Sequence, residues 1–215
     1  MIWGYERSSQ ALLMRIERLV IGSTNPAKIE EWMSFLDRFN VKSVADLGNY
    51  PEPHEVGSTF ALNAIIKASH YAQLTGEYTF SEDGGYEVDA LGGAPGVKSR
   101  RILPGDRDGS DQELIDYVLE RLKGLPPEKR GVKLSFVAAV ADPEGKIVFL
   151  NGNSLAGIVA DKPGPIRIEG YPFRTIHFIP ELGKTYAELT PEEHERYNHK
   201  KPVAQRLIKF LLEYR

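Results

Sequence analysis

Residues 15–28 read RIERLVIGSTNPAK, a β-prone run followed by a polar loop and the start of a helix. The run 15–22 predicts a first strand that ends at a glycine. The loop at 23–25 contains good N-cap residues, and Pro26 suits a first helical turn, so we expect a helix over 27–39. A strand, polar loop and helix in this order direct backbone N–H groups at an anion, although simple helix capping explains the same residues equally well.

Outward from this stretch, helical and strand patterns alternate. Apolar spacing predicts further helices at 59–74, 111–122 and 202–214, and β-prone runs predict strands at 41–47, 78–80, 86–91, 132–141, 146–152 and 154–160. The sequence Asp-Pro-Glu-Gly at 142–145 predicts a hairpin turn. We therefore expect one α/β domain over residues 15–215, with a long mixed central sheet flanked by helices and two lobes around a cleft. Residues 1–14 are interpreted as an N-terminal extension.

Composition limits the classes of function. The chain has 215 residues, no cysteine and a formal net charge of -3. The acidic balance argues against nucleic acid as a partner. The absence of cysteine excludes disulfides, thiolate metal ligands and a cysteine nucleophile, and fits a reducing cytoplasm. No stretch approaches the roughly 20 apolar residues that cross a bilayer, so no membrane partner is expected.

The segment Glu82-Asp83-Gly84-Gly85 follows a β-prone run and is predicted to be an acidic turn. Adjacent carboxylates at the end of a strand suit Mg²⁺, which prefers oxygen ligands, and the glycines let the backbone approach a ligand closely. On this motif alone, an ordinary solvated turn is the favoured interpretation.

Other candidates surround this segment in the sequence. Glu55 precedes a predicted helix, either as a metal ligand or as a favourable charge near the helix N-terminus. Asn63 and Lys67 are spaced i, i+4 on that helix, so they share one face, which could be a solvent face. Residues 94–101 form a loop that could wrap a substrate, and 197–201 group a histidine with two lysines before the last helix.

Taken in order, these motifs resemble the inosine triphosphate pyrophosphatase family, whose members hydrolyse noncanonical purine nucleoside triphosphates to a monophosphate and pyrophosphate. The resemblance spans about residues 19–212. Residues 23–28 are similar to the family's Thr-x-Asn-x-x-Lys loop, and residues 55–68 to its Glu and Thr-Phe-x-x-Asn-Ala-x-x-Lys-Ala helix. Residues 81–100 resemble the signature Ala-Asp-Asp-Ser-Gly-Leu-x-Val-x-Ala-Leu-x-Gly-x-Pro-Gly-Val-x-Ser, and 184–189 its Lys-Thr-x-Ala-Glu-Leu.

The resemblance implies the family's fold, a Mg²⁺-dependent hydrolase of nucleoside triphosphates, and a cytoplasmic homodimer. It implies that Glu55, Glu82 and Asp83 hold the metal, and that Asp83 is catalytic, by binding metal or by orienting and deprotonating the attacking water. Phosphate charge would be neutralised by lysines, and Phe173 would stack on the base. The substrate-binding residues implied are Ser23, Thr24, Asn25, Lys28, Asn63, Lys67, Gly84, Phe173, Arg174, Lys184, His199 and Lys200.

The chain departs from the family pattern at several of these positions. Glu82 replaces the first Asp of the signature, and Gly84 replaces a Ser that touches substrate. Residues 170–174 stand where the family has Gly-Phe-Gly-Tyr-Asp, so the donor-only Arg174 replaces an acceptor. Lys200 replaces the Arg of a Ser-His-Arg segment and keeps its charge without the planar fork. We expect triphosphate and metal handling to be retained, and base preference to be open.

Two alternatives follow from these departures. One is a hydrolase for a different nucleotide, such as a modified pyrimidine or a diphosphate. The other is a nucleotide-binding sensor that has lost catalysis, which would bind nucleotide tightly with metal and show no turnover. Retention of Glu55, Asp83, Lys28 and Lys67 favours an enzyme.

Overall fold

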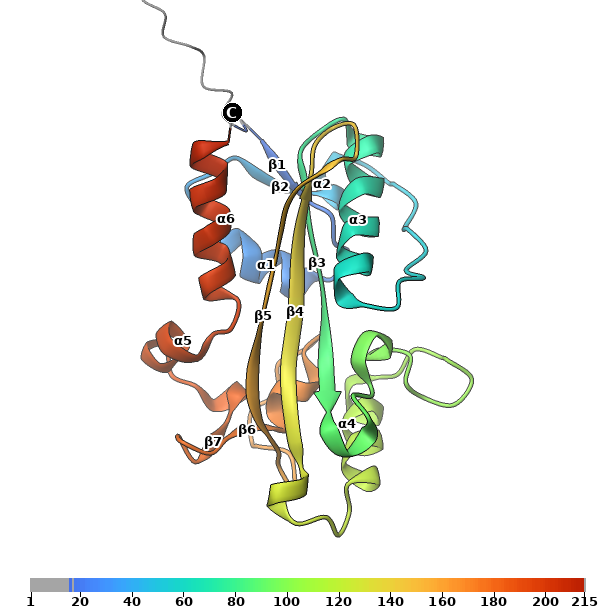
Figure 1. Cartoon of the computed structure of the whole chain (residues 1–215), viewed down its shortest axis with the longest axis vertical. Coiled ribbons are helices and arrows are strands. Elements are labelled where there is room, and N and C mark those ends of the chain that lie inside the picture. Colours follow the sequence, from blue (N-terminus) through green and yellow to red (C-terminus); the bar gives the residue numbers. More distant parts are fainter. Residues whose placement is uncertain (1–15, 17, 215) are drawn as a thin grey trace, which may run out of the picture.

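The computed structural model describes residue 16 and residues 18–214, and within them a seven-stranded sheet runs in the order β2-β1-β3-β4-β5-β6-β7 (Figure 1). β1 is parallel to β2 and β3, and the remaining neighbours are antiparallel. The mixed sheet confirms the predicted α/β fold. The extension predicted at 1–14 lies outside the described residues. The strands are β1 (Leu19–Ile21), β2 (Val41–Ser43), β3 (Thr79–Val88), β4 (Gly131–Ala141), β5 (Ile147–Val159), β6 (His177–Ile179) and β7 (Lys184–Thr185).

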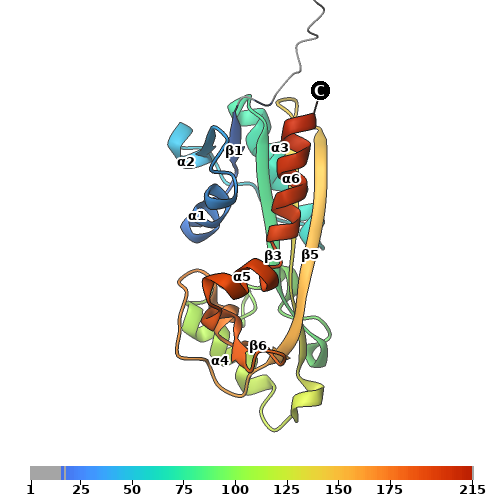
Figure 2. The same cartoon turned by 90° about the vertical axis from the view of Figure 1, so that its left-hand side faces the viewer.

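Helices cover both faces of the upper sheet, with α3 on one side and α1 and α6 on the other (Figures 1 and 2). The predicted helices at 27–39, 59–74, 111–122 and 202–214 are all present, with the first ending earlier than expected. No helix in the described part of the chain is long and apolar enough to span a membrane. The α-helices are α1 (Pro26–Phe35), α2 (Val44–Leu47), α3 (Phe60–Thr75), α4 (Asp111–Arg121), α5 (Pro191–Tyr197) and α6 (Lys201–Glu213).

Strand alternation explains why each face of β4 meets a different helix. Successive side chains of a strand point to opposite faces. Ala139 and Ala141 therefore face α3, where they pack against Ala64, Ala68 and Ala72. Their β4 neighbours Phe136, Ala138 and Val140 face the other way. There they join a cluster that includes Trp32 of α1 and Leu207 of α6. The small alanines let α3 lie close to the sheet.

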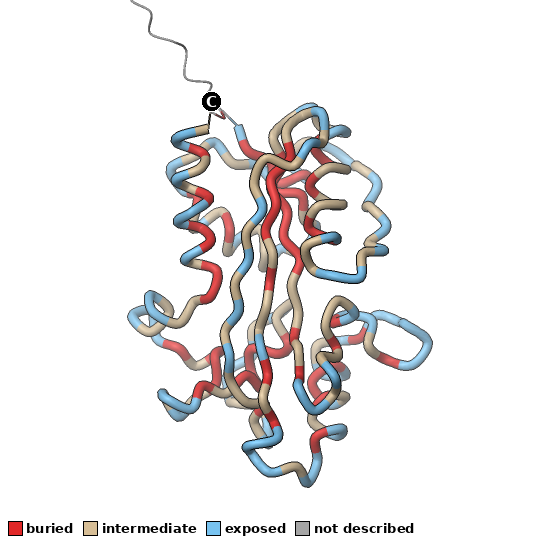
Figure 3. The backbone as a smooth tube through the Cα atoms, viewed as in Figure 1, coloured by how far each residue is buried: buried red, intermediate tan, exposed pale blue. Residues whose placement is uncertain are grey.

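The strands β3, β4 and β5 extend beyond α3 and α6 into a second lobe with its own core (Figures 1 and 3). Tyr86 and Val88 of β3 pack there against Leu114 and Val118 of α4. The predicted division into two lobes corresponds to these separate apolar clusters on shared strands. Two surface hollows that meet at Arg130 and Asp161 lie in the second lobe, and neither is lined by the acidic segment.

Three parts of the prediction were wrong. Residues 82–85 are no turn but the interior of β3, because all four pair with β4 in antiparallel register. The strand expected at 41–47 ends at Ser43, where a capping box with Asp46 starts α2. The strand expected at 86–91 is the end of β3 followed by a single 3-10 turn, Asp89–Leu91. The elements α5, β6 and β7 were not predicted.

Candidate active site

The two carboxylates of the acidic segment point to opposite faces of the sheet, because they are consecutive residues of one strand. Glu82 lies on the face of α1 and α6, where Trp32 donates its indole N–H to Oε2 at 2.8 Å. Asp83 lies on the face of α3, where Asn63 donates Nδ2–H to Oδ2 at 3.1 Å. The adjacent acids therefore belong to two different groups of contacts.

On the α3 face, Asp83 joins a group fixed by the helix. Lys67 places Nζ 3.5 Å from Oδ1 of Asp83 and 3.3 Å from Oε1 of Glu55. Asn63, which is 1% exposed, also accepts the N–H of Gly57 at 2.8 Å on its Oδ1. A single helix turn thus connects the loop that carries Glu55 to the strand that carries Asp83.

The oxygens of Glu55 and Asp83 fit a hard divalent cation. Mg²⁺ is commonly bound through one or two carboxylates, with waters and substrate phosphates completing its shell. Among the described residues there is no group of three or more His, Cys, Asp or Glu side chains with metal-site geometry. Glu55 and Asp83 are the two carboxylates that contact Lys67, and Glu82 is not gathered with them.

Both oxygens of Glu82 are already engaged. Lys200 donates from Nζ to Oε1 at 2.7 Å, Trp32 binds Oε2, and Lys28 lies 3.6 Å from Oε1. Burial opposes ionisation of this carboxyl, but the ammonium groups of Lys200 and Lys28 hold its pKa below the ordinary value. The predicted metal role of Glu82 stays a prediction, while its geometry is that of a counter-ion for two lysines.

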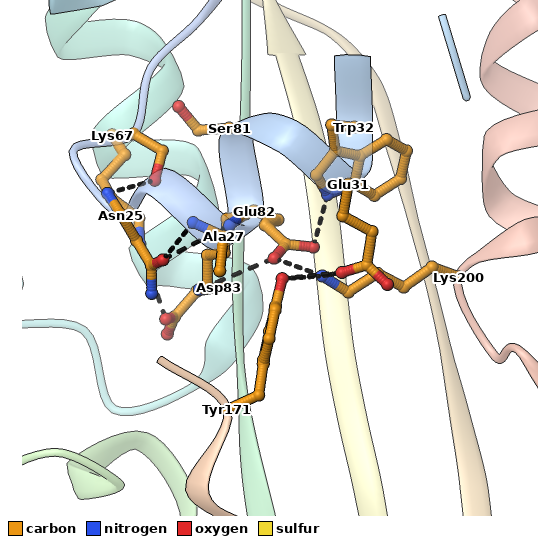
Figure 4. Close-up of polar contacts among 12 residues, drawn as sticks. Asn25, Ala27, Glu31, Trp32, Lys67, Ser81, Glu82, Asp83, Tyr171 and Lys200 are labelled. Carbon is orange, nitrogen blue, oxygen red and sulfur yellow. Dashed lines mark hydrogen bonds and ion pairs between the residues drawn. The ribbon is translucent and has the colours of Figure 1, made fainter. Parts of the chain in front are cut away.

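Glu31 of α1 is a central residue that the sequence patterns did not reveal. Arg174 donates from Nη2 to both of its oxygens at 2.9 Å. Lys200 and the hydroxyl of Tyr171 donate to Oε2 at 2.9 and 2.6 Å (Figure 4). Burial alone would raise the pKa of Glu31, but Lys200 and Arg174 hold it far below the ordinary value. In the sequence, Glu31 is marked only as a charged residue about one helical turn after Lys28.

The first loop is arranged around the start of α1. Asn25 caps the helix, since its Oδ1 accepts the N–H groups of Ala27 and Lys28 at 3.0 and 3.3 Å. Ser23 accepts the N–H of Asn25, and Thr24 is exposed. Burial would lower the pKa of Lys28, but the carboxylates of Glu82, Asp83 and Glu55 raise it above the ordinary value. Lys28 is therefore charged near both groups of contacts.

Glu31, Arg174, Lys200 and Tyr171 form what we call the Glu31 network. The residues expected to bind the nucleobase lie in this network or beside it. Phe173 is 6% exposed, and Tyr86 stacks on one face of its ring at a centroid distance of 4.8 Å. Arg174 stacks over Tyr171, with its Nε buried and without a hydrogen-bond partner among the described residues. His199 packs edge-on against Phe136. Lys184 instead pairs with Glu193, at 2.9 Å, at the far edge of the sheet.

The glycines of the acidic segment permit close packing on both sides. A Cβ on Gly85 would lie 2.3 Å from Oγ of Ser99 and 2.4 Å from O of Gly96, so the loop at 94–101 packs directly on β3. A Cβ on Gly84 would lie 2.6 Å from the carbonyl oxygen of Ser135 and 2.7 Å from Cβ of Phe136.

Gly84→Ala is therefore expected to destabilise the protein by about 1–3 kcal/mol, because the backbone of β4 must shift to admit the methyl group. Urea unfolding of the variant measures this loss. Ala90→Gly is the control, because it changes an exposed site next to the same strand. Gly92→Ala is less suitable, because the φ of Gly92 is positive. A Gly84→Ala variant as stable as the wild type would show that β3 and β4 lie further apart than described.

The buried histidines predict a loss of stability in mild acid. Burial lowers the pKa of His177 to about 4, and burial with Lys200 and Arg174 lowers the pKa of His199 to about 3. Below the ordinary histidine pKa of about 6.5, the unfolded chain binds protons that the folded protein refuses, so stability falls as pH falls. We expect a loss of about 2 kcal/mol for each histidine between pH 7 and pH 5.

Urea unfolding at the two pH values tests this expectation. His177→Gln should reduce the difference in unfolding free energy between pH 7 and pH 5. Replacement of the exposed His54 should leave this difference unchanged. Equal stability of the wild type at pH 7 and pH 5 would contradict it.

A mixed α/β sheet that presents carboxylates and lysines beside the start of a helix is typical of proteins that bind phosphorylated ligands with a metal ion. The family is shown by comparison: residues 19–210 match the model of the Ham1 family, and the chain belongs to this family. This result confirms the family resemblance drawn from the motifs.

Relatives and solved structures agree with this membership. The chain is 38% identical over 191 residues to the dITP/XTP pyrophosphatase of Yersinia pseudotuberculosis, covering 86% of this chain and 93% of that protein. It is 33% identical over 199 residues to the dITP/XTP pyrophosphatase of Bacillus subtilis, covering 91% and 98%. The structure of a HAM1 protein from Coxiella burnetii is similar with a TM-score of 0.77 at 30% identity, covering 91% and 98%.

Proposed function

We propose that the protein is a Mg²⁺-dependent nucleoside triphosphate pyrophosphatase. It hydrolyses noncanonical purine nucleoside triphosphates between the α- and β-phosphates, giving a nucleoside monophosphate and pyrophosphate. The observation that carries the proposal is the group Glu55–Lys67–Asp83, aligned by Asn63 and set beside the start of α1. The relatives named dITP/XTP pyrophosphatase support the substrate class.

Asp83 and Glu55 are the proposed metal ligands, and Asp83 is the proposed catalytic residue, which binds metal or orients and deprotonates the attacking water. When bound, Mg²⁺ would neutralise phosphate charge and, through a phosphoryl oxygen, make the phosphorus atom more open to attack by water. Asp83 accepts the hydrogen bond of Asn63 on Oδ2, and its Oδ1 faces Lys67. Glu82 is the third predicted metal ligand. We rank it below Glu55 and Asp83, because Lys200 and Trp32 bind both of its oxygens.

Phosphate binding is assigned to the first loop and to α3. Lys28 and Lys67 are the proposed cations for the phosphate chain, with Ser23, Thr24 and Asn25 lining the turn before α1. Lys184 is retained as a further candidate that must release Glu193 to take part. Asn63 is the proposed support of the acid beside the phosphates, and Gly84 the point of close approach to substrate.

Binding of the nucleobase is assigned to the second lobe and to the start of α6. Phe173 would present the ring face that Tyr86 does not cover, with Arg174, His199 and Lys200 nearby. The proposals of a homodimer and of a cytoplasmic location rest on the family resemblance, and the latter also on the lack of cysteine.

Incubation with a nucleotide panel tests the proposal. The panel contains inosine, deoxyinosine, xanthosine and standard nucleoside triphosphates and the matching diphosphates, each with Mg²⁺ and with a chelator. We expect metal-dependent release of monophosphate and pyrophosphate from the inosine or xanthosine compounds. Release of orthophosphate would overturn the bond assignment. Tight metal-dependent binding without turnover would identify a sensor instead.

A further inference from the structure

The ammonium group of Lys67 lies between the two carboxylates that are proposed to hold the metal. Its Nζ is 3.3 Å from Oε1 of Glu55 and 3.5 Å from Oδ1 of Asp83. The side chains of Lys67 and Asp83 are only 12% and 10% exposed. Solvent therefore screens these charges incompletely, and Lys67 is a built-in counter-ion for both acids.

Lys67 and a divalent cation held by the same oxygens would compete for them. Mg²⁺ binds carboxylate oxygens at about 2.0–2.1 Å, so a cation held by Glu55 and Asp83 would stand within a few ångströms of the ammonium group. Repulsion between the cations is strong at this separation in a partly buried site. Binding of the metal to both acids therefore requires Lys67 to move away.

A phosphate chain offers Lys67 a new partner. Lysine carries a compact charge on a flexible four-carbon stem, so the ammonium group can move while α3 stays in place. Lys67 sits one turn after Asn63, which holds Asp83 through Nδ2 and the Glu55 loop through Oδ1. The carboxylates are thus held by contacts that do not depend on the ammonium position.

We propose that Lys67 couples the binding of divalent metal to the binding of the phosphate chain: it neutralises Glu55 and Asp83 until phosphates draw it away, which opens the two carboxylates to the metal. This inference rests on the proposed function, since it takes these acids as metal ligands and a phosphate chain as substrate. Because binding free energies are reciprocal, metal bound to the two acids must strengthen phosphate binding by the same factor.

Mn²⁺ binding to the protein without nucleotide is the direct test. The probe is Mn²⁺ itself, with the free ion measured by electron paramagnetic resonance. Lys67→Met should bind Mn²⁺ at least about tenfold more tightly than the wild type, because the competing cation is gone. Lys67→Arg keeps the charge and should stay near the wild-type affinity. Lys123→Met removes an exposed lysine of the other lobe and should change nothing. Lys67→Met with wild-type or weaker Mn²⁺ affinity would overturn the proposal.

A second measurement keeps the proposal testable if Lys67→Met does not fold. In the absence of metal, inorganic tripolyphosphate competes with Glu55 for Lys67. Glu55→Gln should therefore bind tripolyphosphate about fivefold or more tightly than the wild type. Glu52→Gln removes an exposed acid of the same loop and serves as the matched control. Equal gains in the two variants would show a general charge effect and contradict a specific hold on Lys67.

The two proposals fail in different ways. A wild-type protein that hydrolyses no nucleotide, combined with the expected order of Mn²⁺ affinities, would remove the proposed function and leave the competition by Lys67 standing. Turnover of the expected nucleotides, combined with unchanged Mn²⁺ affinity in Lys67→Met, would remove the coupling and leave the function.

Discussion

Asp83→Asn is expected to lower the turnover number by about 10²- to 10⁴-fold, the range for loss of a positioned acid–base group. The amide keeps the size of the side chain and can still contact Asn63, but it removes the negative charge that faces Lys67 and that is proposed to bind the metal. The measurement is steady-state pyrophosphate release with Mg²⁺ on the best nucleotide of the panel. Folding is checked separately by urea unfolding.

One matched control and one comparison variant for Asp83→Asn come from β3 and the turn that follows it. Asp89→Asn changes an exposed acid just beyond β3 and should leave turnover within about twofold of the wild type. Glu82→Gln changes the adjacent acid on the opposite face, so its main effect should be on stability and on the Michaelis constant, through Lys200. Undiminished turnover in Asp83→Asn would remove Asp83 from its proposed role.

The contrast between Glu82 and Asp83 marks the limit of what the sequence could predict. Glu-Asp-Gly-Gly has the composition of a turn, and nothing nearby in sequence contradicts that interpretation. Pairing with β4, about 50 residues further on, makes it a strand instead. Once the segment is a strand, its period of two directs the two acids to opposite faces of the sheet, and the metal role of Glu82 stays a prediction.

Features set by local spacing were predictable. The helix α3, the hairpin of β4 and β5, and the shared face of Asn63 and Lys67 all follow from residues a few positions apart, and the structure shows each of them. The network around Glu31 could not be found in this way. Its partners Arg174 and Lys200 are 143 and 169 residues away in sequence, and only the packing of α1 against the other elements brings them together.

Glu31→Gln is expected to cost about 3 kcal/mol or more of unfolding free energy, because it leaves the buried Arg174 without its carboxylate partner and Lys200 with Glu82 alone. Arg174 and Lys200 would then face each other with side chains 8% and 3% exposed. Glu30→Gln is the matched control, since Glu30 is the exposed neighbour on the same helix, and its cost should stay within about 0.5 kcal/mol.

The pH dependence of the same variant tests the cause. The pKa of Glu31 is held far below its ordinary value of 4.5, so its contribution is complete above that pH and is lost as pH falls through the folded-state value. The difference in unfolding free energy between the wild type and Glu31→Gln should therefore be constant from pH 8 to about pH 6 and shrink only below about pH 4.5. A second variant, Glu31→Gln with Arg174→Met, should recover part of the loss, because it removes the cation that Glu31→Gln leaves without its carboxylate partner. If Glu31→Gln cost less unfolding free energy than Glu30→Gln, the Glu31 network would not stabilise the junction of the two lobes.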